Sequence, residues 1–338
     1  MSILKCLLLI CLVSQISAAA HTGAHCPGNA ASLTLRLVHN ALIVVPIEIN
    51  HSGPYDFVVD TGAQITTIEP GLASELNLKD QGTTGVAGVA TFARVAYTRL
   101  DLITAGTHSV ANAIVLIQEM AQLQAADAGI RGVLGSNFLQ HFDVLIDNSQ
   151  GFICLDDSGL LSSAVEGEHI ALAEPRGSQR DLPFMRPLLV SARVSPGEDA
   201  PILLRIDSGS NVPLLYAEDS RLRKEVRDPK SALTRHVNGV EQSFAMLPPR
   251  NIRIGNRSMK QVSFAVPLNA AGSGPRPRED GLLPTIVFQR VFISCSGGYV
   301  SLDPLVRQVK AAHTSGDQVE RLRSASHEID NEKSVSRE

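Results

Sequence analysis

Two short turns carry the carboxylates that could do chemistry in this sequence. Asp60 lies in the segment Phe57–Ala63, which reads FVVDTGA, and Asp207 lies in the segment Leu203–Ser210, which reads LLRIDSGS. In each, an apolar run ends in Asp, a hydroxyl residue and Gly. The hydroxyl can hydrogen-bond locally, and Gly permits close approach of another segment. Two carboxylates held close together share one proton, so one can act as a general base and the other as a general acid.

An internal repeat contains both turns, and the case for chemistry depends on it, because a single Asp-Ser-Gly is a common structural turn. The two aspartates are 147 positions apart. The first is followed after 72 positions by Gly132–Gly135 (GVLG), and the second after 74 positions by Gly281–Pro284 (GLLP). Later, GFICLD begins at Gly151 and GYVSLD at Gly298. Matching features in one order indicate two homologous halves.

The local patterns that must position these turns are those of β structure. In residues 41–49 apolar and polar side chains alternate, as in a half-buried strand, and short apolar runs bounded by Gly and Pro recur along the chain. Residues 70–76 read as one short helix, and residues 118–128 as a second helix or a surface excursion. We therefore predict an all-β fold of two lobes, residues 26–160 and 161–305.

The composition argues against several classes of partner. The chain has 338 residues, of which 44% are hydrophobic and 19% charged, with a formal net charge of -4. This balance gives no electrostatic basis for binding nucleic acid or an anionic membrane surface. Trp is absent and there are four Tyr, so stacking on bases has little to use. A core large enough for two lobes can nevertheless be buried.

The two ends of the chain differ from the rest. Residues 1–20 predict a secretory signal peptide, because Lys5 precedes the apolar run at residues 6–13 and a row of Ala ends at Ala20. A membrane anchor is the alternative, but a bilayer span takes roughly 20 apolar residues. We expect a secreted or periplasmic protein with no membrane span. The polar segment 306–338 is expected to be a disordered tail or a loosely helical appendage.

The cysteines give weak evidence. Beyond the expected signal peptide the chain keeps Cys26, Cys154 and Cys295, an odd number that allows at most one internal disulfide. Cys154 and Cys295 are not at matching repeat positions, so we expect both to be free and buried in preference to a link between them. No spacing of Cys and His is typical of zinc, and we expect neither a metal nor another cofactor.

At Asp60–Ala63 and Asp207–Ser210 the sequence resembles the paired signatures of pepsin-like and retropepsin-like aspartic peptidases. Gly132–Gly135 is similar to the apolar element that this family holds beside each catalytic turn. The resemblance covers roughly residues 35–305. Ala63 is closer to the retroviral type, whereas two lobes in one chain follow the pepsin plan. The whole is most similar to compact bacterial members.

The resemblance implies two β-barrel-like lobes with a central cleft and an aspartic endopeptidase acting on extended polypeptides. Asp60 and Asp207 would be the catalytic pair, sharing a proton as is established for these peptidases. The ionised carboxylate would take a proton from water, and the protonated one would polarise the scissile carbonyl. A second group of residues, which flank the two aspartates, would orient the pair: Thr61, Gly62, Ser208 and Gly209.

Two features depart from the family pattern. Pro284 stands where the first half has Gly135, and since Pro fixes φ and lacks an N–H, the second loop must differ there. The β-hairpin that covers the site in this family would be the glycine-rich stretch after Gly82, with Gly85 and Gly88 as its mobile positions. No Tyr stands where the pepsin type has one, and a plain surface hairpin is the alternative.

Two other functions compete with hydrolysis. The same fold with an inactive site would be a peptide-binding protein; Pro284 and the unassigned flap favour it, and the presence of both aspartates argues against it. A structural or inhibitor-like envelope protein with a chance repeat is the other, and the ordered matches between the halves argue against that.

Overall fold

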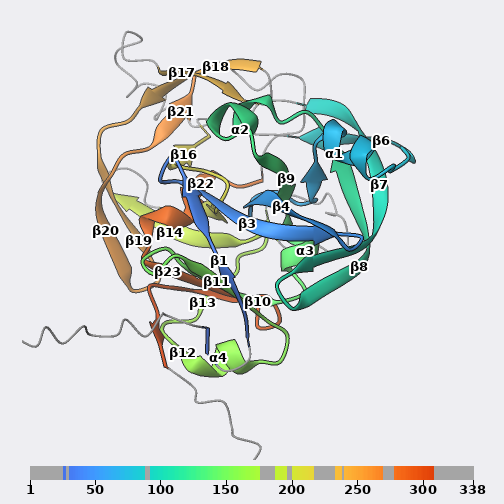
Figure 1. Ribbon diagram of the computed structural model, residues 1–338. Helices are drawn as coiled ribbons and strands as arrows, with labels where there is room; N and C mark the ends of the chain where they lie inside the picture. The colour runs from blue at the N-terminus through green and yellow to red at the C-terminus, as the bar shows by residue number, and fades with distance from the viewer. Residues whose placement is uncertain are drawn as a thin grey trace, which may run out of the picture.

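A computed structural model describes residues 26–27, 30–87, 92–175, 187–195, 200–216, 233–237, 240–268 and 278–307. The predicted signal peptide, Gly88 and the predicted tail from residue 308 on lie outside these residues. Within the described part of the chain, strands dominate and helices are short (Figure 1). The prediction of an all-β fold is confirmed.

The first lobe is built on an eight-stranded sheet. Its strands, in spatial order, are β2 (Arg36–Val38), β3 (Leu42–Ile49), β4 (Ser52–Val59), β9 (Ile130–Leu134), β5 (Thr67–Ile68), β8 (His108–Ile117), β7 (Phe92–Ala105) and β6 (Gly82–Ala87). β3 also pairs with β7, which bends the sheet back on itself. β4 ends at the Asp60 turn and runs parallel to β9, with Val59 opposite Leu134.

The second lobe is built on a nine-stranded sheet. Its strands, in spatial order, are β17 (Leu233–Val237), β18 (Val240–Met246), β21 (Ala265–Pro267), β16 (Leu214–Leu215), β22 (Gly281–Pro284), β15 (Ile202–Asp207), β14 (Leu189–Ser195), β19 (Arg250–Ile254) and β20 (Arg257–Val262). β15 runs parallel to β22, with Asp207 opposite Pro284.

The central strands of the two lobes have one order and one set of directions. β3-β4-β9-β5-β8 corresponds to β14-β15-β22-β16-β21. In both, the strand before the aspartate pairs in parallel with the strand that carries the second motif. In both, a two-residue strand after the aspartate turn then pairs antiparallel to that motif strand. Each aspartate turn is therefore held between neighbouring strands in the same way.

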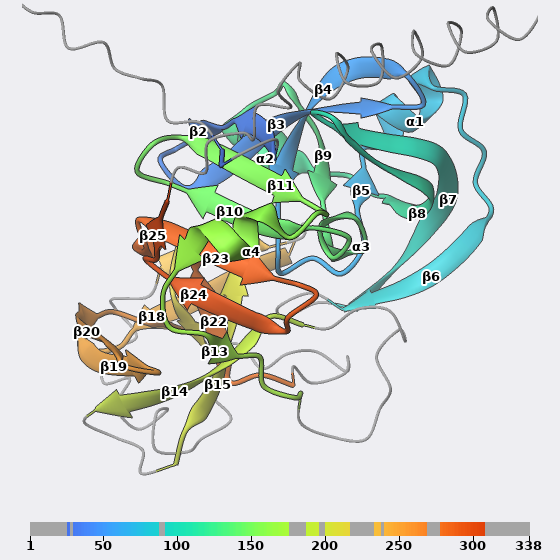
Figure 2. The same cartoon turned by 90° about the horizontal axis from the view of Figure 1, so that it is seen from below.

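A six-stranded antiparallel sheet joins the lobes, and Figure 2 shows it between them. Its strands, in order, are β1 (Ala31–Thr34), β11 (Phe152–Asp156), β10 (Asp143–Asp147), β23 (Arg290–Ser294), β24 (Tyr299–Leu302) and β13 (Ile170–Ala171). β10 pairs antiparallel with β23, and Leu145 lies opposite Phe292. A small ribbon pairs β12 (Val165–Glu166) with β25 (Leu305–Val306).

The helices are peripheral and short. α1 (Pro70–Glu75) begins at a proline that suits the first helical turn, and it buries Leu72 and Ala73. α2 (Ala121–Ala126) settles the alternative left open for residues 118–128 in favour of a helix. α3 (Ser136–Leu139) and the 3₁₀ turn η2 (Thr285–Val287) follow the motif strands of the two lobes, and α4 (Leu160–Ala164) follows β11.

One continuous cluster of buried apolar side chains runs through both lobes and the sheet between them. It includes Ile47 and Phe57 in the first lobe, Val291 in the joining sheet, and Val190 and Ile206 in the second lobe. The alternation of β3, where the side chains of Val45, Ile47 and Ile49 are buried, supplies one wall of this core. Because the core is shared, the two aspartate turns rest on one packed unit.

The cysteine prediction is wrong for Cys154, which forms a disulfide with Cys26 and ties the start of the described chain to β11. The predicted absence of a link between Cys154 and Cys295 is correct, and Cys295 is a free thiol. Burial raises the pKa of Cys295 to about 12. Sequence spacing gave no signal for the pairing, since β1 lies beside β11 only in the folded sheet.

Candidate active site

The Asp60 turn and the Asp207 turn meet where the lobes meet. The strand β4 delivers Asp60, whose backbone N–H donates to Leu134 O of β9 at 3.0 Å. The strand β15 delivers Asp207, which is 7% exposed. Asp60 and Asp207 hydrogen-bond to one another through their side chains. The structure thus brings together the two carboxylates that the repeat singles out.

Thr61 and Ser208 lock the turns to each other through buried hydrogen bonds. Thr61 Oγ1 donates to Ile206 O at 2.9 Å, and Ser208 Oγ donates to Val59 O at 2.8 Å. The backbone N–H groups cross as well: Thr61 N donates to Ser208 Oγ at 3.0 Å, and Ser208 N to Thr61 Oγ1 at 3.1 Å. Each hydroxyl therefore binds the opposite lobe twice, which fixes the distance between the aspartates.

Gly62 and Gly209 are needed because each lies against the aspartate of the other lobe. A Cβ atom at Gly62 would come within 2.6 Å of Asp207 Oδ2, and one at Gly209 within 2.5 Å of Asp60 Oδ2. Carbon and oxygen do not approach so closely without bonding, so any larger residue would push the carboxylates apart. The predicted orienting role of these two residues has this physical basis.

Backbone N–H groups hold each carboxylate in place. Asp60 Oδ1 accepts from Gly62 N at 2.8 Å and from Ala63 N at 3.0 Å, and Asp207 Oδ1 accepts from Gly209 N at 2.8 Å. An N–H donor stabilises the ionised form of a carboxylate. Asp60 has two such donors and Asp207 one, so the two environments differ.

Burial raises the pKa of both aspartates. For Asp60 the loss of solvent is the largest cause, and it is opposed by the two N–H donors, by the hydrogen bond with Asp207 and by the charge of Arg205. For Asp207 burial and then the negative charge of Asp60 raise the pKa well above its usual range, against Gly209 N–H and Arg205. The two carboxylates therefore titrate as a pair, and the second N–H donor favours the ionised form of Asp60 within it.

Pro284 leaves the second turn intact, and the reason lies in a second proline. In the first lobe Gly135 N donates to Thr66 Oγ1 at 3.1 Å, and Thr66 Oγ1 donates to Asn137 Oδ1 at 2.7 Å. In the second lobe Pro284 replaces the glycine and Pro213 replaces the threonine. Donor and acceptor are lost together, so no buried N–H is left without a partner.

The described part of the predicted flap, strands β6 and β7, forms a hairpin. β6 pairs antiparallel with β7, and Gly85 lies opposite Arg94. Gly82, at the start of β6, has φ +140°, a conformation that side chains disfavour. Gly88 lies outside the described residues, and whether the hairpin covers the aspartates stays a prediction.

A hollow of about 360 Å³ lies in the second lobe, lined by residues of β13, β14 and β19 among others. Arg193 and Arg253 line it together with Glu168, whose carboxylate already accepts from Asn256 N at 2.8 Å. Neither Asp60 nor Asp207 lines this hollow. The substrate cleft expected between the lobes stays a prediction.

Residues 45–138 match a family model described as aspartyl protease. This match supports an aspartyl peptidase family for the chain. The matched segment runs from β3 to α3 and contains the Asp60 turn, the β6–β7 hairpin and the Gly132–Gly135 element. Asp207 lies outside it, so the pairing of Asp207 with Asp60 rests on the internal repeat and the geometry. A comparison with curated proteins found no match.

Three polar residues beside the turns were not predicted from the sequence. Thr66 and Asn137 bind one another behind the first turn, and Arg205 reaches the first turn from the second lobe. Arg205 had a signal, because it is the one charged residue in an otherwise apolar run before Asp207. Thr66 and Asn137 had none, since only folding brings these positions, 71 residues apart, into contact.

In the described part of the chain there is no group of three or more His, Cys, Asp or Glu side chains that could hold a metal ion. Nor does any helix described there have the length and hydropathy that a membrane crossing requires.

Proposed function

We propose that this chain is an aspartic endopeptidase that hydrolyses peptide bonds in extended polypeptides. The observation that carries the proposal is the hydrogen-bonded pair of Asp60 and Asp207, one from each lobe, at the end of equivalent strands. A buried pair of carboxylates costs stability, and Gly62 and Gly209 are needed to accommodate it. Such an arrangement has a use when it shares a proton.

The different environments of the two aspartates support distinct roles. Asp60, with two N–H donors, takes a proton from a water molecule, whose oxygen attacks the carbonyl carbon of the scissile bond. Asp207 gives its proton to the carbonyl oxygen, so that the tetrahedral species carries no net oxyanion. When this species collapses, the proton held by Asp60 passes to the leaving nitrogen, the C–N bond breaks, and Asp207 recovers its proton.

The β6–β7 hairpin is the proposed flap. A lid must open to admit a polypeptide and close to keep bulk water from the aspartates. Supporting this role, the hairpin extends from a sheet whose other strands carry the Asp60 turn, and Gly85 lies within it. Gly88, the other predicted mobile position, is outside the described residues.

We also propose export, to a secreted or periplasmic location. The Cys26–Cys154 disulfide supports this, since such bonds persist in oxidising compartments. Its partner Cys26 follows closely on the predicted signal peptide. The supporting leader sequence itself, residues 1–20, lies outside the described residues.

Cleavage of an unfolded polypeptide by the purified protein lacking residues 1–20, with and without pepstatin, tests the function. The matched controls are Asp60→Asn in the site and Asp101→Asn on the exposed face of β7. We expect pepstatin-sensitive cleavage that only Asp60→Asn abolishes. Peptide binding without cleavage would favour the inactive binding protein of the same fold. A purified protein that neither cleaves nor binds the polypeptide would overturn the proposal.

A further inference from the structure

Arg205 is the feature of the second lobe that the repeat does not explain. It lies in β15 two residues before Asp207, at the position that Val58 occupies before Asp60. Val58 is 1% exposed and belongs to a small apolar cluster with Ile130. In the second lobe the counterpart of Ile130 is Glu279, two residues before the motif glycine in each case. An ion pair thus replaces an apolar pair at equivalent places.

The guanidinium of Arg205 crosses the boundary between the lobes. Its Nη1 donates to Gly62 O, within the catalytic turn of the first lobe, at 2.8 Å. Its Nη2 lies 2.9 Å from Glu279 Oε1. The side chains are 18% exposed for Arg205 and 6% for Glu279. The contact therefore combines a buried ion pair with a hydrogen bond to the residue that touches Asp207.

Stability does not account for this pair. Removing two charges from water is costly, and a well-packed apolar pair is often the more stable choice. The first lobe has such an apolar pair, Val58 and Ile130, at the equivalent positions. The pair is also incompletely satisfied, because Arg205 Nε and Glu279 Oε2 have no hydrogen-bond partner among the described residues. A function other than stability is needed to explain it.

The charge of Arg205 acts on both aspartates, opposing the effect of burial on each pKa. Besides the aspartates, the titratable groups around it include Glu279 and Asp280, which precede β22, and Tyr216, which follows β16; the carboxylate of Asp280 accepts from Leu203 N of β15 at 2.7 Å. The pKa of Tyr216 is raised, first by burial and then by the charge of Glu279, so its phenol stays neutral. Arg205 is the cation of this group that reaches the first lobe.

We propose that Arg205, held by Glu279, is a positioning residue that fixes the Gly62 turn against Asp207 and keeps a positive charge beside the pair of aspartates. The proposal rests on the proposed peptidase function and names a further residue for it. It differs from a simple tie between the lobes, because a tie would affect stability and leave the protonation of the site unchanged.

The test exchanges the ion pair for the apolar pair of the first lobe. The double variant Arg205→Val/Glu279→Ile leaves no unpaired buried charge, so we expect it to fold. Without the positive charge, both limbs of the pH profile of kcat/KM should move to higher pH, and kcat should fall about 10- to 10²-fold as the turn is misplaced. Arg205→Lys keeps the charge, so the limbs of its pH profile should lie closer to their wild-type positions than its kcat lies to the wild-type value.

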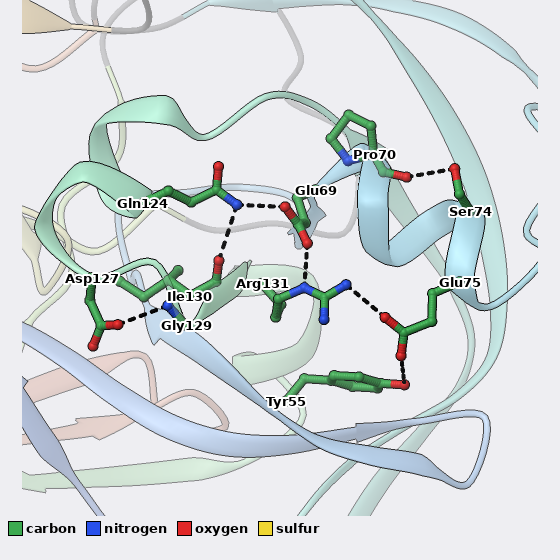
Figure 3. Close-up of polar contacts among 10 residues, drawn as sticks. All are labelled: Tyr55, Glu69, Pro70, Ser74, Glu75, Gln124, Asp127, Gly129, Ile130 and Arg131. Carbon is green, nitrogen blue, oxygen red and sulfur yellow. Dashed lines mark hydrogen bonds and ion pairs between the residues drawn. The ribbon is translucent and has the colours of Figure 1, made fainter.

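The matched control is Arg131 of the first lobe, another partly buried arginine, which is paired with Glu69 and Glu75 (Figure 3). Arg131→Gln should lower stability and leave the pH limbs in place. Unchanged limbs in a folded Arg205→Val/Glu279→Ile protein would overturn the proposal. If that double variant does not fold, Arg205→Gln is compared with Arg205→Lys, and pH limbs that coincide in these two variants would overturn it equally.

Titration of the aspartate carboxyl groups by ¹³C NMR separates this proposal from the peptidase function, because it needs no substrate. A rise in the apparent pKa of the pair in the double variant supports the role of Arg205 even in a protein that cleaves nothing. Cleavage by the wild-type protein combined with identical titrations would retain the peptidase function and reject the role of Arg205.

Discussion

The two lobes hold the same turn by different means. Behind Asp60, Thr66 and Asn137 form a polar lock with the N–H of Gly135. Behind Asp207, the equivalent positions of the threonine and the glycine are prolines. The strand order and register are nevertheless the same on both sides. The comparison teaches that the backbone arrangement is the shared requirement, and that side-chain hydrogen bonds or the stiffness of proline can each supply it.

The lobes also differ in where they put charge. The first lobe has ion pairs around Arg36 and around Arg131, and those of Arg131 join α1 to β9 and reach Tyr55 through Glu75 (Figure 3). The second lobe directs Arg205 toward the other lobe's catalytic turn. Related sheets thus support one symmetric pair of aspartates in an asymmetric electrostatic environment, in which Asp60 accepts from two backbone N–H groups and Asp207 from one.

Replacing Asp207 by Asn should have the largest effect on activity. The loss of the proton donor lowers kcat by about 10²- to 10⁴-fold. Stability should change in the opposite direction. Because the pKa of Asp207 is raised by folding, its contribution to stability is fully present below about pH 3.9 and is lost as the pH rises through the folded value.

Asn has no charge to lose, so Asp207→Asn should be more stable than the wild-type protein at neutral pH, with no difference below about pH 3.9. Thermal unfolding of both proteins across this range is the measurement, and Asp101→Asn on the exposed face of β7 serves as control. A variant less stable than wild type at neutral pH would mean that Asp207 is not the buried, protonated member.

Thr61→Val should disrupt the hydrogen bonds between the Asp60 turn and the Asp207 turn. It removes the bond to Ile206 O and leaves the buried Ser208 N–H without its acceptor, at a cost of about 1–3 kcal/mol in the free energy of unfolding. Thr104→Val, which loses an exposed bond to Ser109, should stay within about 0.5 kcal/mol. Chemical unfolding measures both, and equal effects would contradict the proposed importance of the hydrogen bonds between the two turns.

The difference between the polar lock and the prolines predicts unequal sensitivities. Thr66→Val leaves the N–H of Gly135 without its acceptor and should lower the free energy of unfolding by about 1–3 kcal/mol. Pro213→Ala keeps the carbonyl that accepts from Ala265 N and should cost only about 0.4–1 kcal/mol, through the greater freedom of the unfolded chain. If Pro213→Ala lowered the free energy of unfolding more than Thr66→Val, the two lobes would not hold their turns in these different ways.

Gly85→Ala should have the smallest effect. Its position in β6, paired with β7, leaves few buried contacts to lose, so stability should change little. If the hairpin is the flap, added stiffness should lower turnover. Steady-state kinetics beside thermal unfolding is the check, with Thr83→Ala on the same strand as control. Wild-type turnover in both variants would argue for a lid elsewhere.

The sequence predicted the features that recur in both halves of the repeat. It missed the contacts that form only when distant parts of the chain fold together. The equivalence of Gly135 and Pro284 follows from motif spacing, and the parallel pairs β4–β9 and β15–β22 bear it out. The compensation by Pro213 was invisible, because nothing in the sequence says that its counterpart Thr66 accepts a hydrogen bond from Gly135 N. The same holds for Cys26, whose partner is 128 residues away on a neighbouring strand.

The catalytic claim rests on the two aspartates acting as one unit, and a double-mutant cycle of kcat/KM tests this most directly. The proteins are wild type, Asp60→Asn, Asp207→Asn and the double variant, each checked for folding. If one shared proton links the pair, either single change removes nearly all activity, and the double variant is no worse than the poorer single variant. Losses that add in free energy, or a single variant that keeps most of its activity, would contradict a shared catalytic pair.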